Sequence, residues 1–445
     1  MNTKQSTRIA PHQAPRVHTL RTSATPTFDY DVAVVGLGYV GLPTALAHHE
    51  AGLRVLALDA SPERLLAIGS GLVDLNDSDL VRLSHALGDD QFQLTVDASE
   101  LSRARSVIVC VPTPVDHHLV PDLAPLRIAC ASVVARAVPG QLLMLTSTTY
   151  VGCTQDFLVT PLRRRGLEVG EDVFVAFSAE RIDPGSQSVE QEAVPRVVGG
   201  ATPACEQRAI ELLGTATNHI HPVPSLGTAE MTKLLENTFR AVNIALVNEF
   251  SDICQSLDID VTHVIDAAAT KPYGFMAFRP GPGVGGHCIP CDPHYLLWQL
   301  RRTRVDAPLM TEAMQQVAAR PRKVIDRIQS VLAERGMPIA GTRILVVGVA
   351  YKPDVADVRE SPALEILQRL RDAGASVGFV DSHVPSIRLN GDEELKAVAD
   401  PETFKPGLVL LHTLHRDSDL SWMSTDQLLI DTTYRHALSA QQVSL

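Results

Sequence analysis

A strand, a glycine-rich turn, a helix and a second strand follow one another early in the chain, and no other stretch constrains the fold as much. The β-branched run 31–35 leads into Gly36-Leu-Gly-Tyr-Val-Gly41, and Asp59 ends the second strand. Glycines in this pattern allow a tight turn and a close backbone approach, while the helix N-terminus offers free N–H groups to a pyrophosphate. The order of these elements predicts a dinucleotide-binding domain.

Asp59 also predicts which dinucleotide is bound. An acid about 20 residues after the turn can accept a hydrogen bond from a ribose hydroxyl, and it would repel the 2′-phosphate of NADP. A glycine-rich turn with a purely structural role is the alternative, but such a turn requires neither the helix nor the acid. We therefore expect NAD as the cofactor.

Further apolar runs continue this pattern and predict a doubly wound parallel sheet. They lie at 107–111, 142–145, 173–177 and 196–198. Ligands of such sheets bind beyond the carboxyl ends of the strands, so the polar residues that follow these runs should border one crevice. Capping and turn chemistry is the alternative for the Ser and Thr side chains. The residues expected at the crevice are Pro112, Thr113, Ser147, Thr148, Glu180 and Arg181.

A second α/β pattern begins at Thr342 and reaches Asp381. Its first strand ends in Gly348 but lacks the three glycines of a dinucleotide turn, so we expect a nucleotide-binding fold of another kind. Lys352 and Arg359 follow this strand end and are candidate phosphate ligands. Ordinary surface charges are the alternative.

Helical patterns separate the two α/β regions, from Thr228 to about Leu257 and from Leu309 to Gly336. Lys233, Asn237 and Arg240 occupy positions i, i+4 and i+7 of the first helix and therefore share a face. These side chains could point together into a cleft, with a solvated polar face as the alternative. The expected fold class is α/β, with two Rossmann-like doubly wound parallel-sheet domains joined by a central helical domain.

The stretch from Gly281 to His294 combines glycines, a nucleophile and a carboxylate. Glycine removes the Cβ atoms that would keep a bound substrate from the backbone, and Asp292 follows Cys288 by four residues. A cysteine attacks an aldehyde carbon once it is a thiolate. The alternative is that Cys288 is a small buried apolar residue. We expect an active-site loop.

This loop also contains metal-ligand types at close spacing, since His287, Cys291 and His294 accompany Cys288 and Asp292. A zinc site would need further ligands, and the chain contains no second Cys-x-x-Cys. The order also lacks the histidine that c-type haem attachment requires directly after the second cysteine. We therefore expect no metal.

Composition limits the partners and the compartment. A formal net charge of -12 argues against nucleic acid, whose binding depends on a basic surface. No apolar run reaches the roughly 18 residues of a membrane span, and the N-terminus lacks the apolar core of a secretory signal. Seven cysteines without an export signal suggest a reducing compartment, so we expect a cytoplasmic protein. Residues 1–28 are expected to form a disordered basic tail, with a transit peptide as the alternative.

Four motifs in order resemble the UDP-glucose/GDP-mannose dehydrogenase family over nearly the whole chain after residue 29. They are Gly36-Leu-Gly-Tyr-Val-Gly-Leu-Pro43, Lys233 with Asn237, the stretch 281–293 and the stretch 348–362. The resemblance implies a homodimer or higher homo-oligomer that acts on a UDP-sugar in polysaccharide biosynthesis. It also implies three domains: an NAD-binding Rossmann domain (29–222), a central helical dimerisation and catalytic domain (223–335) and a UDP-binding Rossmann-like domain (336–445).

The resemblance implies a four-electron oxidation of the sugar C6 alcohol to a carboxylate, with two hydrides passed in turn to two NAD molecules. Asp292 and an ordered water would remove the alcohol proton. The Cys288 thiolate would capture the aldehyde as a thiohemiacetal, which a second oxidation converts into a thioester. Glu180 would activate the water that hydrolyses the thioester. Lys233 and Asn237 would stabilise oxyanions at C6, and Lys233 would also lower the thiol pKa.

The same resemblance implies two sets of binding residues. Thr148 belongs to the first set and would also position substrate or water during catalysis. The cofactor-binding residues are Gly36, Gly38, Tyr39, Val40, Gly41, Asp59, Arg64, Pro112, Thr113, Ser147 and Thr148. The substrate-binding residues are Glu180, Arg181, Lys233, Asn237, Arg240, Phe278, Gly285, Lys352 and Arg359.

The stretches 236–249 and 271–276 look like the branch of the family that oxidises UDP-N-acetylhexosamines. UDP-N-acetylglucosamine is the expected substrate, with UDP-glucose, UDP-N-acetylgalactosamine and UDP-N-acetylmannosamine as alternatives. Arg240 could donate to the acetamide carbonyl, and Met276 or Phe278 could cover the methyl group. A non-catalytic sensor of NAD and a nucleotide sugar is the alternative of another class, although binding alone does not need a nucleophile. Cys291 departs from the family pattern, in which we expect a non-cysteine residue.

Overall fold

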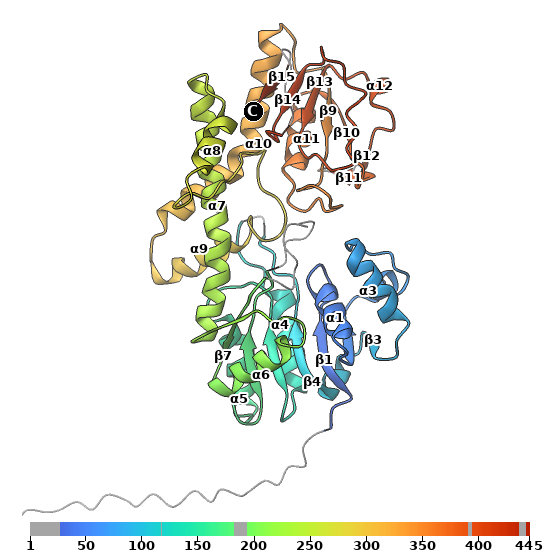
Figure 1. The fold of residues 1–445 in the computed structure, drawn as a ribbon, viewed down its shortest axis with the longest axis vertical. Coiled ribbons are helices and arrows are strands. Elements are labelled where there is room, and N and C mark those ends of the chain that lie inside the picture. The colour runs from blue at the N-terminus through green and yellow to red at the C-terminus, as the bar shows by residue number, and fades with distance from the viewer. Residues whose placement is uncertain (1–26, 117, 182–193, 390–393, 436–441) are drawn as a thin grey trace, which may run out of the picture.

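The computed structural model describes residues 27–116, 118–181, 194–389, 394–435 and 442–445. Figure 1 shows two α/β domains, at the bottom and the top of the view, connected by long helices along one side. This arrangement confirms the predicted fold class. The tail expected over residues 1–28 lies outside the described residues, except for residues 27 and 28. Within the described ranges, no helix has the length and apolar character needed to cross a membrane.

The first domain is built on an eight-stranded sheet with the order β3-β2-β1-β4-β5-β6-β7-β8. Strands β2, β5 and β6 are buried along their whole length, because helices cover both faces of the sheet. The strands are β1 (Tyr30–Val35), β2 (Val55–Leu58), β3 (Phe92–Thr95), β4 (Ala104–Val109), β5 (Leu142–Leu145), β6 (Phe174–Phe177), β7 (Arg196–Gly200) and β8 (Ile220–Val223).

One feature of this sheet differs from the fully parallel arrangement that the sequence predicts. Strand β7 pairs antiparallel with β6 and parallel with β8, so the last two strands run opposite to the first six. An antiparallel neighbour needs no crossover helix, whereas a parallel one does. The described residues between β6 and β7, which are 178–181, 194 and 195, contain no helix.

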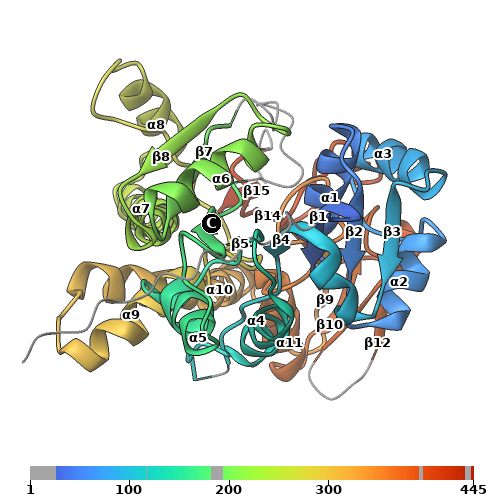
Figure 2. The same ribbon diagram turned by 90° about the horizontal axis from the view of Figure 1, so that it is seen from below.

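Helices lie on both faces of the first sheet, as a doubly wound fold requires; Figure 2 shows α1 and α6 on one side and α4 and α5 on the other. Local sequence determines where α2 begins, since the Ser61 hydroxyl accepts a hydrogen bond from the N–H of Arg64 at 3.1 Å and Pro62 takes the first helical position. The helices are α1 (Gly41–Glu50), α2 (Pro62–Gly69), α3 (Asp77–Leu87), α4 (Ala124–Arg136), α5 (Thr160–Arg164) and α6 (Pro203–Leu213), with a 3-10 turn at Ala98–Arg103 and a π-type turn at Gln155–Val159.

The central region confirms the two long helical patterns. It contains α7 (Leu226–Ser256), α8 (Val261–Ala269), α9 (Asp292–Thr303) and α10 (Pro308–Glu334). Helix α7 starts against the first domain, where the buried carboxylate of Glu230 accepts hydrogen bonds from the N–H groups of Gly152 and Thr154 at 2.6 and 2.9 Å. Helix α10 packs along α7 and leads into the second domain.

The second domain has a five-stranded parallel sheet with the order β10-β9-β13-β14-β15. This sheet confirms the second α/β pattern of the sequence. The strands are β9 (Arg343–Val347), β10 (Ser376–Val380), β13 (Leu408–Leu411), β14 (Leu429–Asp431) and β15 (Gln442–Ser444); an antiparallel ribbon of β11 (Ser386–Arg388) and β12 (Glu394–Lys396) and the helices α11 (Pro362–Asp372) and α12 (Pro401–Phe404) accompany them.

Candidate active site

The glycine-rich turn after β1 has a separate steric reason for each glycine. Gly36 has a φ of +89°, and a Cβ there would lie 2.7 Å from the carbonyl oxygen of Cys110. A Cβ at Gly41 would lie 1.7 Å from the carbonyl oxygen of Gly36, so only glycine allows α1 to start here. A Cβ at Gly38 would meet no atom within 4 Å. Gly38 therefore leaves open space beside the N-terminus of α1, where a pyrophosphate fits.

Asp59 and Arg64 hold this turn in place. The carboxylate of Asp59 accepts hydrogen bonds from the N–H groups of Leu37, at 2.7 Å, and Ser61, at 2.9 Å. The Nε of Arg64 donates to the carbonyl oxygen of Leu37 at 2.9 Å. Each carboxylate oxygen has further lone pairs that a ribose can use. Five of the residues predicted to bind NAD, Gly36, Gly38, Gly41, Asp59 and Arg64, thus form a cradle that fits this cofactor.

The other predicted cofactor residues lie at the ends of β4 and β5. Thr113 and Ser147 are buried, Thr148 is half-buried and Pro112 is exposed. The hydroxyl of Ser147 donates to the carbonyl oxygen of Val111 at 2.7 Å. For Ser147 the structure therefore supports the alternative of turn chemistry, because its one proton is used within the protein.

Asp292, Asn237 and Lys233 meet where α7 contacts the start of α9. The side-chain amide of Asn237 donates to the carboxylate of Asp292, which is only 1% exposed. Burial raises the pKa of Asp292 to about 7, while the positive charge of Lys233 and the hydrogen bond from Asn237 act in the opposite direction. A carboxyl group with a pKa near neutrality can take up and release a proton under working conditions.

Cys288 lies one turn before this carboxylate. Its carbonyl oxygen accepts hydrogen bonds from the N–H groups of Cys291 and Asp292, at 3.2 and 2.8 Å, and its side chain is exposed. The alternative of a buried apolar cysteine is therefore wrong for Cys288. The N-terminus of α9 follows directly, and a helix N-terminus stabilises a thiolate.

The glycines of the loop before Cys288 serve a purpose that the sequence did not indicate. A Cβ at Gly285 would lie 2.6 Å from the Cβ of Tyr351, and one at Gly283 would lie 2.8 Å from the Cγ of Pro362. The N–H of Gly286 donates to the carbonyl oxygen of Arg359 at 2.9 Å. These glycines allow the loop to pack on the second domain, so the atoms closest to them belong to protein rather than to a space for substrate.

Two residues that the sequence analysis missed fix the start of this loop. The side-chain oxygen of Asn248 accepts from the N–H of Gly281 at 3.0 Å, and the Nε of Arg320 donates to its carbonyl oxygen at 3.0 Å. Arg320 is buried and also pairs with Asp252 at 2.6 Å. Both residues lie inside helices with an ordinary amphipathic sequence pattern, so nothing in the neighbouring sequence distinguishes them.

Glu180 and Arg181, at the end of β6, are already engaged with other side chains. The carboxylate of Glu180 forms an ion pair with Arg196, a residue that the sequence analysis did not single out. The guanidinium of Arg181 pairs with Glu236 of α7 and donates to the carbonyl oxygen of Pro195 at 2.7 Å. Arg181 therefore connects the first domain to the central helix.

The remaining predicted substrate residues are more scattered. Arg240 is exposed, whereas Asn237 on the same helix is buried, so the shared face becomes accessible toward its C-terminal end. Phe278 is half-buried and packs edge-on against Phe239 at 6.1 Å between ring centroids. The ammonium of Lys352 lies 5.8 Å from the centre of the Tyr351 ring.

Arg359 joins the two nucleotide-binding domains. Its guanidinium lies 4.3 Å from the centre of the Tyr39 ring in the glycine-rich turn, and it pairs with Asp357 at 2.6 Å. The hydroxyl of Tyr39 donates to Asp74 at 3.0 Å. A residue predicted to bind substrate and one predicted to bind cofactor are thus in contact with each other.

Among the described residues, one group of metal-ligand types lies close together, and it is in the second domain: Asp354, His383 and His415. The Nδ1 of His415 accepts a hydrogen bond from the N–H of Asp354 at 2.8 Å. The neutral ring must then carry its proton on Nε2, which lies 3.1 Å from an oxygen of Asp381. A protonated nitrogen does not coordinate a metal, so this group does not fit a metal ion.

Comparison with known proteins agrees with this geometry. Three family models match in chain order: the NAD binding domain (residues 30–217), the central domain (227–317) and the UDP binding domain (345–434) of the UDP-glucose/GDP-mannose dehydrogenase family. The chain is 33% identical to UDP-N-acetyl-D-glucosamine 6-dehydrogenase of Pseudomonas aeruginosa, over 80% of this chain and 83% of that protein. It is 34% identical to UDP-N-acetyl-D-mannosamine dehydrogenase of Escherichia coli (strain K12), over 76% and 81% of the two chains.

A solved structure matches the fold over almost the full length. The UDP-D-ManNAc dehydrogenase of Pyrococcus horikoshii superposes with a TM-score of 0.84 at 28% identity, covering 93% of this chain and 98% of that one.

Proposed function

Because this chain belongs to the UDP-glucose/GDP-mannose dehydrogenase family and is an NAD-dependent nucleotide-sugar dehydrogenase, we propose that it oxidises the C6 alcohol of a UDP-N-acetylhexosamine to a carboxylate. The observation that carries the proposal is the buried Asp292 carboxylate, which accepts a hydrogen bond from Asn237, is influenced by the positive charge of Lys233 and lies one turn after the exposed Cys288. A base, oxyanion-stabilising donors and a nucleophile are the groups that this oxidation requires.

In the first oxidation, Asp292 accepts the proton of the C6 hydroxyl through a water molecule. Its pKa near neutrality suits this task. The ammonium of Lys233 and the amide of Asn237 stabilise the negative charge that develops on the C6 oxygen. The glycine-rich turn, with Gly36, Gly38 and Gly41, would hold NAD, which would supply the hydride acceptor for each oxidation.

In the second half of the reaction, the sulfur of Cys288 bonds to the aldehyde carbon and the carbonyl oxygen becomes an alkoxide. Loss of the second hydride from this carbon gives a thioester. Water then adds to the thioester, and the carbon–sulfur bond breaks to release the carboxylate and the thiolate. The ion pair with Arg196 orients Glu180, which we assign to the activation of this water.

For the substrate we favour UDP-N-acetylglucosamine, supported by the stretches 236–249 and 271–276 and by the similarity to the Pseudomonas protein. UDP-N-acetylmannosamine has comparable support from the Escherichia coli and Pyrococcus proteins. UDP-N-acetylgalactosamine and UDP-glucose are the further alternatives. Arg240 and Phe278, on neighbouring segments, are assigned to the acetamide group.

The proposal includes a homodimer formed through α7. Large apolar side chains are exposed along this helix at spacings of three, four and seven residues, which places them on one face. Such a continuous apolar stripe is typical of a protein interface. Its members are Met231, Leu235, Phe239, Leu246, Phe250 and Ile253. Light scattering of Leu246→Glu should report a monomer where the native protein reports a dimer.

NADH formation with a panel of the four UDP-sugars tests the catalytic proposal. We expect the highest kcat/KM with an N-acetyl sugar and no uronate formation by Cys288→Ala. NADH formation that stays absent with every sugar, together with measurable sugar binding, would instead support a non-catalytic sensor. A native preference for UDP-glucose would contradict the substrate but not the reaction.

A further inference from the structure

Cys288 and Cys291 are closer together in the sequence than any other two cysteines, and the proposed mechanism uses only Cys288. All seven cysteines lie in the described ranges and are present as thiols. A Cys-x-x-Cys pair at the start of a helix is a common arrangement of redox-active thiols. Cys291 therefore needs a physical explanation of its own.

The backbone brings the two cysteines within disulfide range. The N–H of Cys291 donates to the carbonyl oxygen of Cys288 at 3.2 Å, which closes a turn between them, and the N–H of Asp292 donates to the same oxygen at 2.8 Å. The ends of such a turn have Cα atoms less than about 7 Å apart. Disulfides span Cα distances of roughly 4.4–6.8 Å. A bond between the two sulfurs would therefore need little backbone movement.

The two thiols differ in environment in the way that a reactive and a resolving cysteine do. Cys288 is exposed at the helix N-terminus, whereas Cys291 is buried and its sulfur accepts a hydrogen bond from the N–H of Val115. Burial raises the pKa of Cys291 to about 12, so it does not compete with Cys288 for an aldehyde. Cys291 reacts only after the sulfur of Cys288 has been oxidised to a form that a thiol can attack.

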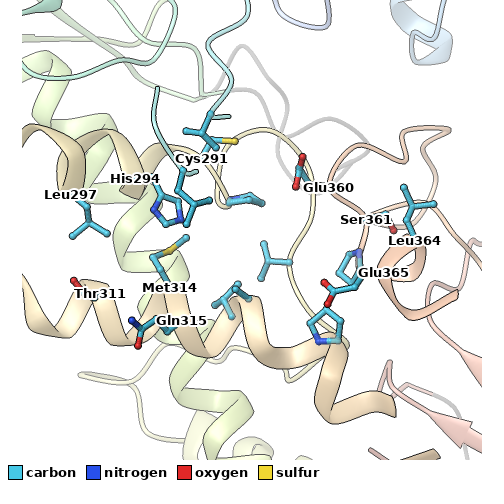
Figure 3. Close-up of a pocket in the computed structure, with 18 of the residues that line it drawn as sticks. Cys291, His294, Leu297, Thr311, Met314, Gln315, Glu360, Ser361, Leu364 and Glu365 are labelled. Atoms are coloured by element: carbon cyan, nitrogen blue, oxygen red, sulfur yellow. The ribbon is translucent and has the colours of Figure 1, made fainter. Parts of the chain in front are cut away.

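Cys291 can also be approached from a second side. A cleft of about 1430 Å³ runs between α9, α10 and α11, and Cys291 lines it while Cys288 does not. Figure 3 shows Cys291 and His294 on one wall of this cleft, across from Met314 of α10. A small thiol or water molecule can therefore approach Cys291 from this cleft.

We propose that Cys288 and Cys291 form a reversible disulfide when the enzyme meets hydrogen peroxide, so that the loop is a site of oxidation that switches catalysis off and protects the nucleophile. The inference takes the reactivity of Cys288 from the proposed function, but the disulfide itself is independent of turnover.

The chemistry proceeds in two steps. The Cys288 thiolate attacks one peroxide oxygen, the O–O bond breaks, and the sulfur is oxidised to a sulfenic acid while peroxide is reduced to hydroxide. The Cys291 sulfur then attacks the sulfenyl sulfur, the S–S bond forms, and the hydroxyl group leaves with the Cys291 proton as water. A dithiol then reduces the 288–291 disulfide back to two thiols. Without Cys291, a second peroxide would oxidise the sulfenic acid to an irreversible sulfinic acid.

The test treats the full-length enzyme with hydrogen peroxide and then with dithiothreitol, and compares the native protein with Cys291→Ala. The native protein should lose its activity and recover most of it, and peptide mass spectrometry should find a 288–291 disulfide. Cys291→Ala should start with near-native activity, lose it under peroxide and recover several-fold less, with sulfinic acid at Cys288. Cys254→Ala, which removes another buried thiol, should behave like the native protein.

Two results would overturn the inference: a peroxide-treated native chain without the 288–291 disulfide, or full recovery of Cys291→Ala. The mass measurement on the native chain decides the matter even if Cys291→Ala does not fold. If the disulfide forms in a protein that oxidises none of the sugars, the proposed function fails and this inference stands.

Discussion

The two nucleotide-binding domains begin with the same turn and then diverge. In each, a glycine with positive φ follows the first strand: Gly36 at +89° and Gly348 at +77°. In each, an acid at the end of the second strand accepts a hydrogen bond from the N–H of the residue after this glycine: Asp59 from Leu37 and Asp381 from Val349, both at 2.7 Å. The scaffold is therefore shared, and the difference in ligand must arise beyond these positions.

The divergence starts two residues after the first glycine. Gly38 leaves open space in the first domain, whereas the corresponding residue of the second domain is the buried Ala350. Asp381 accepts further N–H groups from Ala350, His383 and Val384, at 3.2, 2.9 and 3.0 Å. The second turn is thus filled by protein, and the loop after it packs on the central domain instead. A Rossmann scaffold can serve either as a cradle or as a support for a neighbouring loop.

If the two Rossmann-like domains bind nucleotides without taking part in the chemistry, a substitution in the central domain should remove turnover and leave nucleotide binding intact. We expect Asp292→Asn to lower kcat by about 10²–10⁴-fold, because Asn cannot accept the alcohol proton. Calorimetry should show near-native affinity for NAD and for the UDP-sugar. Native kcat/KM should rise with pH through about 7 as Asp292 loses its proton.

The same substitution should stabilise the protein. The folded state raises the pKa of Asp292 from 3.8 to about 7, so it binds this proton more tightly than the unfolded chain does. Native stability therefore falls as the pH rises through this window. Above pH 7, Asp292→Asn should raise the free energy of unfolding by about 1–3 kcal/mol, since each pKa unit corresponds to about 1.4 kcal/mol. Lower stability of the variant in urea at pH 8 would contradict this account.

A substitution at Gly38 would make the first turn more like the second. Gly38→Ala adds a Cβ in the space beside the α1 N-terminus, where it should meet the pyrophosphate and not the protein. We expect about a tenfold weaker affinity for NAD, which corresponds to about 1.4 kcal/mol, and unchanged melting. The matched change Ala350→Gly should not create a second NAD site. Native NAD affinity in Gly38→Ala would show that the pyrophosphate lies elsewhere.

Substitutions of the two corresponding acids, Asp59 and Asp381, should affect different properties: NAD binding in the first case and stability in the second. Burial raises the pKa of Asp381, but the nearby His415 ring and the backbone N–H groups outweigh it and hold the pKa at about 2. Its stabilising effect is therefore present above pH 4 and is lost as the pH falls toward 2. Asp381→Asn should lower stability at pH 7 by about 1–2 kcal/mol, and the difference should narrow in urea unfolding at pH 3.

Asp59→Asn provides the matched control for that experiment. It should weaken NAD binding and reduce the discrimination against NADP, with little effect on unfolding, because only two N–H groups contact this carboxylate in the described residues. Equal losses of stability from the two substitutions would remove the distinction between a cradle and a filled turn.

The sequence predicted most of the scaffold because its information is local. The turn at Gly36–Gly41, the acid Asp59 and the helix around Lys233 and Asn237 each follow from spacing and residue type. The ion pair of Glu180 with Arg196 and the contacts of Arg320 could not be predicted, since they join segments whose distance in space depends on the whole fold.

The loop glycines illustrate the same limit from the opposite direction. The number of glycines predicted that another group approaches the loop backbone closely, but it did not identify that group. The nearest neighbours of Gly283, Gly285 and Gly286 are Pro362 and Tyr351 of the second domain, more than sixty residues away in sequence. A pattern of small residues therefore predicts contact distance, while the partner is determined by the tertiary arrangement.

The smallest expected effect concerns a contact between the first turn and the loop that follows the second, the guanidinium of Arg359 over the ring of Tyr39 at 4.3 Å. Removing Arg359 alone also leaves Asp357, which is 5% exposed, without its ion pair, so a single substitution overstates the contact. A double-mutant cycle with Arg359→Lys and Tyr39→Leu isolates it. We expect a coupling of about 0.5–1 kcal/mol, measured as a two- to fivefold difference in the KM for NAD. Arg103 over Tyr30, at 5.4 Å within the first domain, is the matched pair and should show no coupling in KM. If the Tyr39–Arg359 cycle also gives none, this contact has no energetic consequence for NAD binding and does not couple the two turns.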